Sequence, residues 1–437
     1  MTVSRHEHAI EGHLLELRKQ LHQSLIGTID FAAADRIGRE QFIRDCRARA
    51  EQLLERDNHG LSATDRGWLV QGVIDDMFGL GPLEPLLADP TVSDVLVVRH
   101  DHVFVEREGR LQPAVAHFRD TVHLMNVIQR IVRNAGRRID ERSPLVDARL
   151  PDGSRVNAII PPLAIDGPQL SIRRFPEKAL DLPRLVELGS IAPATAELIR
   201  GAVAGRVNII FSGGAGVGKT TMLNAASAHL APIERVITIE DAAELRLRGD
   251  HVVRLETRAA NVEGVGEITP RDLVRNALRM RPDRIIVGEC RGAEAFDMMQ
   301  AMNTGHEGSM STLHANSARD TLIRLETMLS MGGYDMPVRV LREYVASAIQ
   351  MVVHMVRLPD GRRVVGEVVE VCGSDESGVR FRTLHRYQLE SFRDGRAIGR
   401  FEATGEVPDF MARLAARGHH LDPTLFQRGV LTGGHAA

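Results

Sequence analysis

Long apolar runs and cysteines are both scarce in this 437-residue sequence. No stretch approaches the roughly 18 apolar residues that cross a bilayer, and the first eight residues lack the apolar core of a secretory signal. We therefore expect neither a spanning helix nor a signal peptide. The cysteines Cys46, Cys290 and Cys372 show no C-x-x-C spacing. That pattern argues against a disulfide framework or a cysteine zinc site, and it fits a reducing cytoplasm.

An excess of charge of one sign is also missing. The 55 Lys and Arg and 58 Asp and Glu residues give a net charge of −3, and aromatic residues make up 4% of the chain. Dedicated nucleic-acid binders are normally basic, and binders of single strands combine basic with aromatic residues. We therefore expect no direct nucleic-acid partner, while local basic surfaces stay open. The length predicts two or three domains.

What the sequence does contain is a phosphate-binding motif. Residues 213–220 read Gly-Gly-Ala-Gly-Val-Gly-Lys-Thr and fit G-x-x-x-x-G-K-[ST]. Glycine allows backbone angles that a Cβ forbids, so successive N–H groups can turn inward around an anion. Lys219 can reach the β- and γ-phosphates, and Thr220 offers a hydroxyl to Mg²⁺. The predicted nucleotide-binding residues here are Gly213, Gly214, Ala215, Gly216, Val217, Gly218, Lys219, Thr220 and Thr221.

The residues around the loop support this interpretation. Residues 207–211 form a short apolar run that predicts a buried strand, and residues 222–230 predict a helix. Bound phosphates would then lie at a helix N-terminus, where anions are favoured. The alternative, a glycine-rich turn with a solvated lysine, does not require a strand and a helix on the correct sides. We predict that the protein binds a nucleoside triphosphate.

The rest of the chain divides into segments of different pattern. Residues 1–60 have apolar residues at helical spacing and predict a helical extension. Residues 61–183 predict an α+β domain, closed by a linker that starts at Pro176. Residues 184–373 alternate strands and helices, which predicts an α/β domain with a largely parallel sheet and its ligand at the carboxyl ends of the strands. Residues 374–437 form a C-terminal extension.

Two acidic residues follow predicted strands of the α/β domain. Glu240 begins Glu-Asp-Ala-Ala-Glu, and Glu289 ends Arg-Ile-Ile-Val-Gly-Glu, the pattern of a Walker B strand. Hydrolysis needs Mg²⁺ held in place and a group that orients the attacking water. We predict that Glu289 polarises the attacking water. We predict a catalytic role for Glu240 as well, and metal binding by Glu240 and Thr220. The alternative for either acid is a helix cap or a surface ion pair.

A Gly-, Ser- and Thr-rich segment, residues 304–316, carries His306 and His314. Two histidines eight positions apart are poorly spaced as metal ligands. His314 directly follows an apolar strand end, which suits a hydrogen bond to a phosphate or to the water beside Glu289. We therefore predict a catalytic role for His314, with a structural histidine as the alternative.

These motifs, in this order, resemble the Walker A, Asp box, Walker B and His box of the type II/IV secretion ATPases. Within that superfamily the chain looks most like the CpaF-like ATPases of tight-adherence pilus assembly. Supporting strings are residues 79–86, 147–157 and 170–175. The resemblance covers about residues 62–372 and returns at 399–405. It departs at Val98-Arg-His100, where many relatives have an Asn-Gly turn, and at Cys290, where valine or isoleucine is common.

The resemblance implies a RecA-like P-loop ATPase domain that uses ATP and Mg²⁺. It also implies a homohexamer in the cytoplasm, peripheral at the inner face of the cytoplasmic membrane, with a membrane platform protein as partner. Family arginines that reach the phosphates from the N-terminal side correspond to Arg155, Arg173 and Arg174, which the residues alone would place on the surface. The expected function is a motor for pilus assembly or retraction, or for secretion. A RecA-like nucleic-acid translocase and a non-hydrolysing nucleotide-sensing scaffold are the alternatives.

Overall fold

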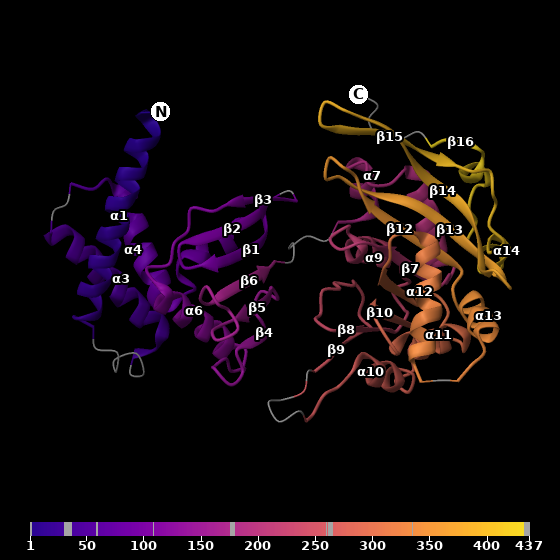
Figure 1. The fold of residues 1–437 in the computed structure, drawn as a ribbon, viewed down its shortest axis with the longest axis horizontal. Helices are drawn as coiled ribbons and strands as arrows, with labels where there is room; N and C mark the ends of the chain where they lie inside the picture. Colours follow the sequence, from indigo (N-terminus) through magenta and orange to yellow (C-terminus); the bar gives the residue numbers. More distant parts are fainter. Residues whose placement is uncertain are drawn as a thin grey trace. The chain divides into compact units, whose positions relative to one another are not determined.

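The computed structural model describes residues 2–29, 37–57, 60–107, 109–174, 180–258, 260, 265–333 and 335–431. The chain forms two compact units, Met1–Pro176 and Glu177–Ala437 (Figure 1). Within the described ranges, no helix has both the length and the apolar character that a bilayer span needs. The finer division at residues 60/61, 183/184 and 373/374 stays a prediction.

In the described residues, the first unit opens with the helices α1 (Thr2–Ile26), α3 (Arg39–Arg56) and α4 (Ala63–Phe78). Leucines at helical spacing on α1, such as Leu17, Leu21 and Leu25, are buried against apolar residues of α3 and α4. Ser62 caps α4 by accepting a hydrogen bond from the backbone N–H of Asp65 at 3.1 Å.

An antiparallel sheet forms the rest of the first unit, with the strand order β3-β2-β1-β6-β5-β4. The short helices η1 (Gly81–Leu83) and α5 (Glu84–Ala88) lead into it. Helix α6 (Thr121–Asn134) buries Leu124, Val127, Ile128 and Ile131 in the core that the sheet shares. The strands are β1 (Val92–Arg99), β2 (His102–Arg107), β3 (Arg110–Pro113), β4 (Leu145–Arg149), β5 (Arg155–Ile159) and β6 (Gln169–Arg173).

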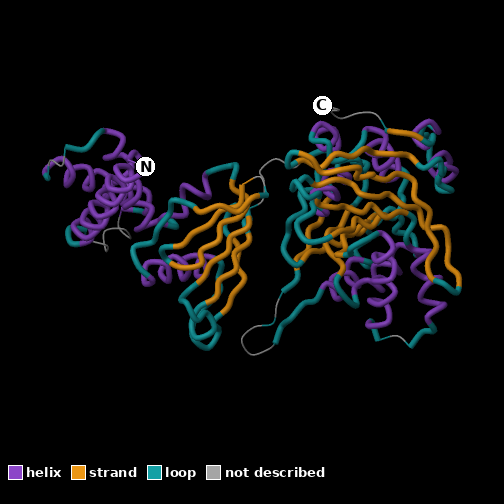
Figure 2. Tube along the Cα trace, turned by 45° about the horizontal axis from the view of Figure 1, so that its top comes forward, coloured by secondary structure: helices purple, strands orange, loops and turns teal. Residues whose placement is uncertain are grey.

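A ten-stranded sheet forms the centre of the second unit, in the order β16-β15-β14-β13-β12-β7-β11-β10-β8-β9 (Figure 2). The strands from β12 through β7, β11, β10 and β8 to β9 are parallel, and β13 to β16 are added antiparallel. Their bounds are β7 (Ile209–Gly213), β8 (Val236–Glu240), β9 (Val252–Glu256), β10 (Arg284–Cys290), β11 (Met310–His314), β12 (Met351–Arg357), β13 (Arg363–Asp375), β14 (Gly378–Arg393), β15 (Arg396–Ala403) and β16 (Gly429–Val430).

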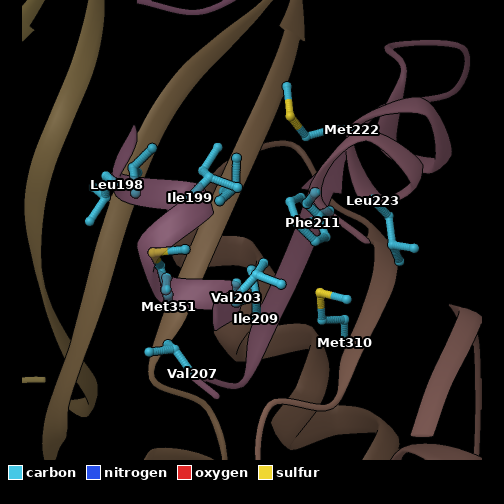
Figure 3. Packing of buried hydrophobic residues seen from close by; sticks show 14 of the residues in the cluster. Leu198, Ile199, Val203, Val207, Ile209, Phe211, Met222, Leu223, Met310 and Met351 are labelled. Carbon is cyan, nitrogen blue, oxygen red and sulfur yellow. The ribbon is translucent and has the colours of Figure 1, made fainter. Parts of the chain in front are cut away.

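Helices cover both faces of the parallel strands. Helices α7 (Leu182–Glu187), α8 (Pro193–Ala204) and α9 (Lys219–Ser227) share a core with Ile209 and Phe211 of β7 (Figure 3). Ile210, between them, belongs to the core on the other face, as the twofold alternation of a strand requires. That face carries α10 (Pro270–Ala277), α11 (Glu294–Asn303), α12 (Ala318–Met331) and α13 (Val338–Ala348).

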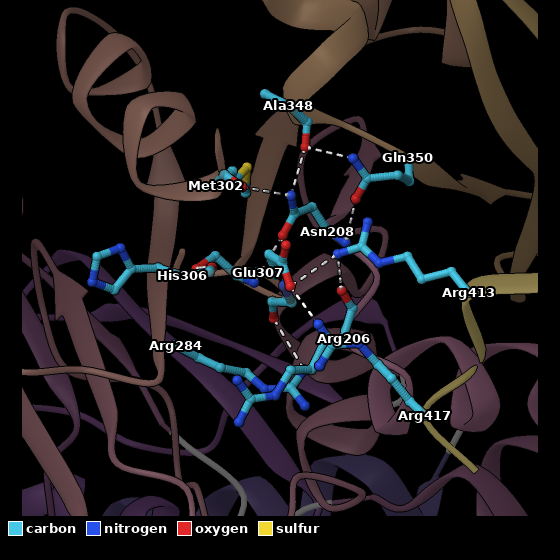
Figure 4. Close-up of polar contacts among 12 residues, drawn as sticks. Arg206, Asn208, Arg284, Met302, His306, Glu307, Ala348, Gln350, Arg413 and Arg417 are labelled. Carbon is cyan, nitrogen blue, oxygen red and sulfur yellow. Dashed lines mark hydrogen bonds and ion pairs between the residues drawn. The ribbon is translucent and has the colours of Figure 1, made fainter. Parts of the chain in front are cut away.

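A buried polar network ties the amino ends of these strands together (Figure 4). The Asn208 side chain accepts hydrogen bonds from the N–H groups of Gly308 and Ser309 at 2.6 and 3.1 Å, and donates to Ala348 at 2.7 Å. Buried Arg284 pairs with Glu234 at 2.8 Å. The residues that enter β7, β10 and β11 are thereby fixed at the edge opposite the phosphate loop.

The C-terminal residues belong to this unit. Strands β14 and β15 extend the sheet, and α14 (Met411–Ala416) and η2 (Pro423–Phe426) pack onto the core that contains α8. Two arginines at α14 reach the segment before β11: Arg413 lies 3.3 Å and Arg417 2.5 Å from Glu307 (Figure 4). The sequence pattern predicts no strands in this extension.

Candidate functional site

The phosphate loop spans the end of β7 and the start of α9. A Cβ on Gly213, whose φ is +148°, would lie 2.4 Å from the carbonyl oxygen of Met355, so only glycine fits beside β12. Val217 is buried, whereas Ala215 and Gly216 are exposed. Thr220 is half-buried at the second residue of α9, next to half-buried Thr221. Gly213 and Val217 therefore fix the loop to the protein, Ala215 and Gly216 are open to solvent, and the N-terminus of α9 follows directly.

Lys219 is held over this loop. Its Nζ donates to the carbonyl oxygen of Gly214 at 2.7 Å and stands 3.4 Å from both ring nitrogens of His314. Burial lowers the pKa of Lys219, while the carboxylate of Glu289 acts in the opposite direction. The predicted lysine and histidine, 95 residues apart in the sequence, thus meet at one point.

Glu289 joins the same cluster. Its Oε1 lies 3.0 Å from Nε2 of His314, and its Oε2 accepts a 2.8 Å hydrogen bond from Arg291. Burial alone would raise the pKa of Glu289, but Arg291, His314 and Lys219 hold it below the ordinary value. A half-buried carboxylate that stays ionised and faces an imidazole can accept a proton from water.

Glu240 occupies a different environment at the end of β8. Its Oε2 accepts hydrogen bonds from the backbone N–H groups of Glu244 and Leu245 at 2.7 and 2.8 Å. Burial raises the pKa of Glu240 to about 6, against the effect of these two hydrogen bonds. A Cβ on Gly288 would lie 2.8 Å from Cγ of Glu240, so a glycine is needed there on β10. The other carboxylate oxygen, Oε1, is buried without a hydrogen-bond partner.

The three predicted N-terminal arginines lie in the first unit. Arg155 and Arg173 are directly opposite each other on β5 and β6, and Arg149 of β4 is opposite Arg155. The exposed Arg173 pairs with Asp94 at 3.1 Å. Arg174 instead donates to the backbone carbonyls of Val92, at 2.9 Å, and Asp89. The sheet register therefore brings Arg155 and Arg173 together, while Arg174 supports the start of β1.

Arg291 and Asp241 also belong to the site, and the sequence predicted a role for neither. Arg291 bridges Glu289 and Asp241, with 3.0 Å between its Nη1 and Oδ2 of Asp241. Asp241 directly follows Glu240, so it was within the quoted acidic string. Neither residue carried a signal of its own, because a charged residue after a strand is usually on the surface. Their link forms only because β8 and β10 are neighbours in the sheet.

The residues present fit a magnesium nucleotide. The open loop, the N-terminus of α9 and Lys219 supply N–H groups and positive charge for phosphate. The unpartnered Oε1 of Glu240 and the hydroxyl of Thr220 are oxygen ligands of the kind Mg²⁺ takes. In the described part of the chain no group of three or more His, Cys, Asp and Glu side chains converges on one point. Mg²⁺ sites that use substrate phosphates need only one or two carboxylates.

Comparison with known proteins gives consistent matches. The family model for the type II/IV secretion system protein matches residues 76–388. One relative is the putative conjugal transfer protein Rv3659c of Mycobacterium tuberculosis (strain ATCC 25618 / H37Rv). It is 42% identical to this chain over 299 residues, which cover 67% of this chain and 84% of the relative. The conjugal transfer protein TrbB of Rhizobium radiobacter is 31% identical over 70% of this chain and 90% of its own.

Among solved structures, the VirB11 ATPase of the Brucella suis type IV secretion system, in complex with sulphate, is similar to this chain. It shares 29% identity, with 69% of this chain and 96% of that chain covered and a TM-score of 0.37.

Proposed function

The chain belongs to the type II/IV secretion system protein family, and on that basis we propose that it is a Mg²⁺-dependent ATPase that powers a secretion or pilus machine. The predicted fold class is confirmed: a RecA-like P-loop domain follows an α+β domain and N-terminal helices. The tight-adherence subfamily stays a prediction. The observation that supports hydrolysis best is the line from Lys219 through His314 to Glu289, with separations of 3.4 and 3.0 Å.

In this proposal each side chain has a distinct task. Glu289 orients the attacking water and accepts its proton, because its carboxylate is ionised and half-buried. Lys219 and the loop N–H groups bind the β- and γ-phosphates and stabilise the charge that develops there. His314 holds Glu289 on one side while Arg291 holds it on the other. Mg²⁺, when bound at Thr220 and Glu240, would neutralise phosphate charge.

The wider setting of the motor is also a proposal. We infer a homohexamer in the cytoplasm, at the inner face of the cytoplasmic membrane, with a membrane platform protein as partner. The relatives named for conjugal transfer support a secretion machine of this kind. The arginine row of the first unit, Arg149, Arg155 and Arg173, is the proposed source of further positive charge for the phosphates.

A turnover assay tests the proposal. Purified protein with Mg²⁺ and ATP should release phosphate, and adding single- or double-stranded DNA should leave the rate unchanged. Stimulation by DNA would favour the alternative, a nucleic-acid translocase on the same fold. Tight ATP binding without any phosphate release would favour a nucleotide-sensing scaffold.

A further inference from the structure

The phosphate loop has unlike neighbours on its two sides in the sheet. On one side of β7 lie β11 and β10, which carry His314 and Glu289 at their carboxyl ends. On the other side lie β12 and then β13 (Figure 1). Lys219 leans toward the first side, with Nζ 3.4 Å from His314. With the γ-phosphate beside β11 and β10, as the proposed function requires, the side of β12 and β13 is left for the rest of the nucleotide.

The loop is packed tightly against that second side. Met355 of β12 is in register with Gly213, and its carbonyl oxygen occupies the space that a Cβ on Gly213 would need. At Gly218 a Cβ would lie 3.9 Å from Cε of Met355 and 3.9 Å from Cδ of Arg363. The side chain of Arg363 thus runs alongside the residue that precedes Lys219.

Arg363 has the chemistry for a nucleotide at this place. It is exposed, opens β13 and stands directly opposite Arg357, the last residue of β12. A guanidinium group binds phosphate oxygens through its planar fork and also stacks on aromatic rings.

Opposed arginines are not by themselves a site. Arg393 and Arg396 are paired in the same way at the β14–β15 turn, farther along the sheet from the phosphate loop. What distinguishes Arg363 is the loop beside it. Arg396 is therefore a matched control, since it has the same residue type, is also exposed and also opens a strand after a hairpin turn.

We propose that Arg363 binds the nucleoside monophosphate end of the nucleotide, through its α-phosphate or the face of its base. This inference rests on the proposed function and adds to it the orientation of the nucleotide in the site. The γ-phosphate points to Glu289, and the nucleoside lies over the turn between β12 and β13.

Equilibrium dialysis with radiolabelled ATP and ADP tests the assignment, with unlabelled pyrophosphate as a competitor that needs only two phosphate positions. In Arg363→Ala the affinities for ATP and ADP should both fall about tenfold, because one charge-assisted contact common to both is lost. The affinity for pyrophosphate, obtained from the competition, should stay unchanged. Arg396→Ala should have the wild-type affinity for all three compounds. Equal melting temperatures of the three proteins establish that the fold is intact.

Two results would overturn the assignment: unchanged ATP affinity in Arg363→Ala, or an equal loss for pyrophosphate, which would place Arg363 at the β- and γ-phosphates. Wild-type protein that binds no ATP would contradict the proposed function and remove this inference with it. Arg363→Lys tests whether charge alone is enough. Retained affinity means that a point charge suffices, as it does at the α-phosphate, and lost affinity means that the planar guanidinium is needed, for a forked phosphate contact or for stacking on the base.

Discussion

At the scale of single residues, the site depends on charges that hold one another in place. Lys219, His314 and Glu289 form a continuous line, and Arg291 extends it to Asp241. Each neighbour contributes to the charge state of the next: Glu289 raises the pKa of His314, while burial lowers it overall. A substitution within this line should therefore change the ionisation of its neighbours as well as remove a contact.

Lys219→Ala should weaken ATP binding by about 10- to 100-fold, since a charge-assisted contact with the β- and γ-phosphates is lost. Titration with a fluorescent ATP analogue measures this. Arg396→Ala, at the β14–β15 turn, is the control for loss of a cation elsewhere. An undiminished affinity in the lysine variant would remove the phosphate-loop interpretation.

Arg291→Ala should move the acid limb of the pH–rate profile to higher pH. Arg291 lowers the pKa of Glu289, so its removal raises that pKa and leaves Glu289 protonated over a wider range. The base must be ionised to accept a proton, so activity should fall most at low pH. Arg291→Lys, which keeps the charge, should shift the limb less. A uniform loss of rate at every pH would make Arg291 a purely structural residue.

At the scale of elements, α1 is attached to the first unit by buried polar groups. Arg18 pairs with the buried Asp76 of α4 at 2.6 Å, and Arg119 donates to Nδ1 of His22. His123 of α6 lies 3.4 Å from Asp76. Burial, with help from Arg119 and Arg18, lowers the pKa of His22 to about 4 and that of His123 to about 3.

This arrangement predicts a loss of stability in mild acid. Both histidines are neutral in the folded unit and have a pKa near 6.5 when unfolded, so the unfolded chain binds more protons below pH 6.5. The free energy of unfolding should therefore not depend on these histidines above pH 6.5, and it should fall as the pH drops from 6.5 toward 4. Thermal melting from pH 7.5 to 4.5 measures the slope. His22→Gln should show a shallower slope than the wild type, and an identical slope would exclude His22 as a source.

The order of strands and helices around the phosphate loop can be predicted from the sequence, whereas other parts of the site cannot, for physical reasons. The strand before the loop, the helix after it and the position of Glu289 in β10 follow from local strand, turn and helix chemistry. Arg149 joins Arg155 and Arg173 only through the register of three antiparallel strands, which no local pattern encodes. Strands β14 and β15 mix arginines with apolar residues. β14 pairs with β13 and β15 pairs with β14, so each depends on a partner earlier in the chain.

At the scale of the whole molecule, the proposed function draws on residues of both units. The second unit has the phosphate loop and the proposed water-activating acid, and the first has the arginine row. A ligand changes a conformational equilibrium only if it makes different contacts in the two states. ATP and ADP differ by the γ-phosphate, which makes that group the natural source of any difference.

The paired change Arg155→Ala with Arg173→Ala should weaken ATP binding more than ADP binding, because two positively charged groups proposed to contact the γ-phosphate are removed. We also expect ATP to compact the protein in small-angle X-ray scattering, and the paired change should reduce that compaction. Arg174 is left in place because it binds the carbonyl oxygen of Val92. Equal losses for both nucleotides, with unchanged compaction, would make the row an ordinary charged surface.

The most direct test of the whole account is single-turnover phosphate release by Glu289→Gln beside the wild type, with Mg²⁺ saturating and the protein in saturating excess over ATP. The amide has the shape of the carboxylate but cannot take a proton from water. We predict that the variant binds ATP as tightly as the wild type and releases phosphate about 100- to 10,000-fold more slowly. Release at the wild-type rate would contradict the assignment of hydrolysis to this site.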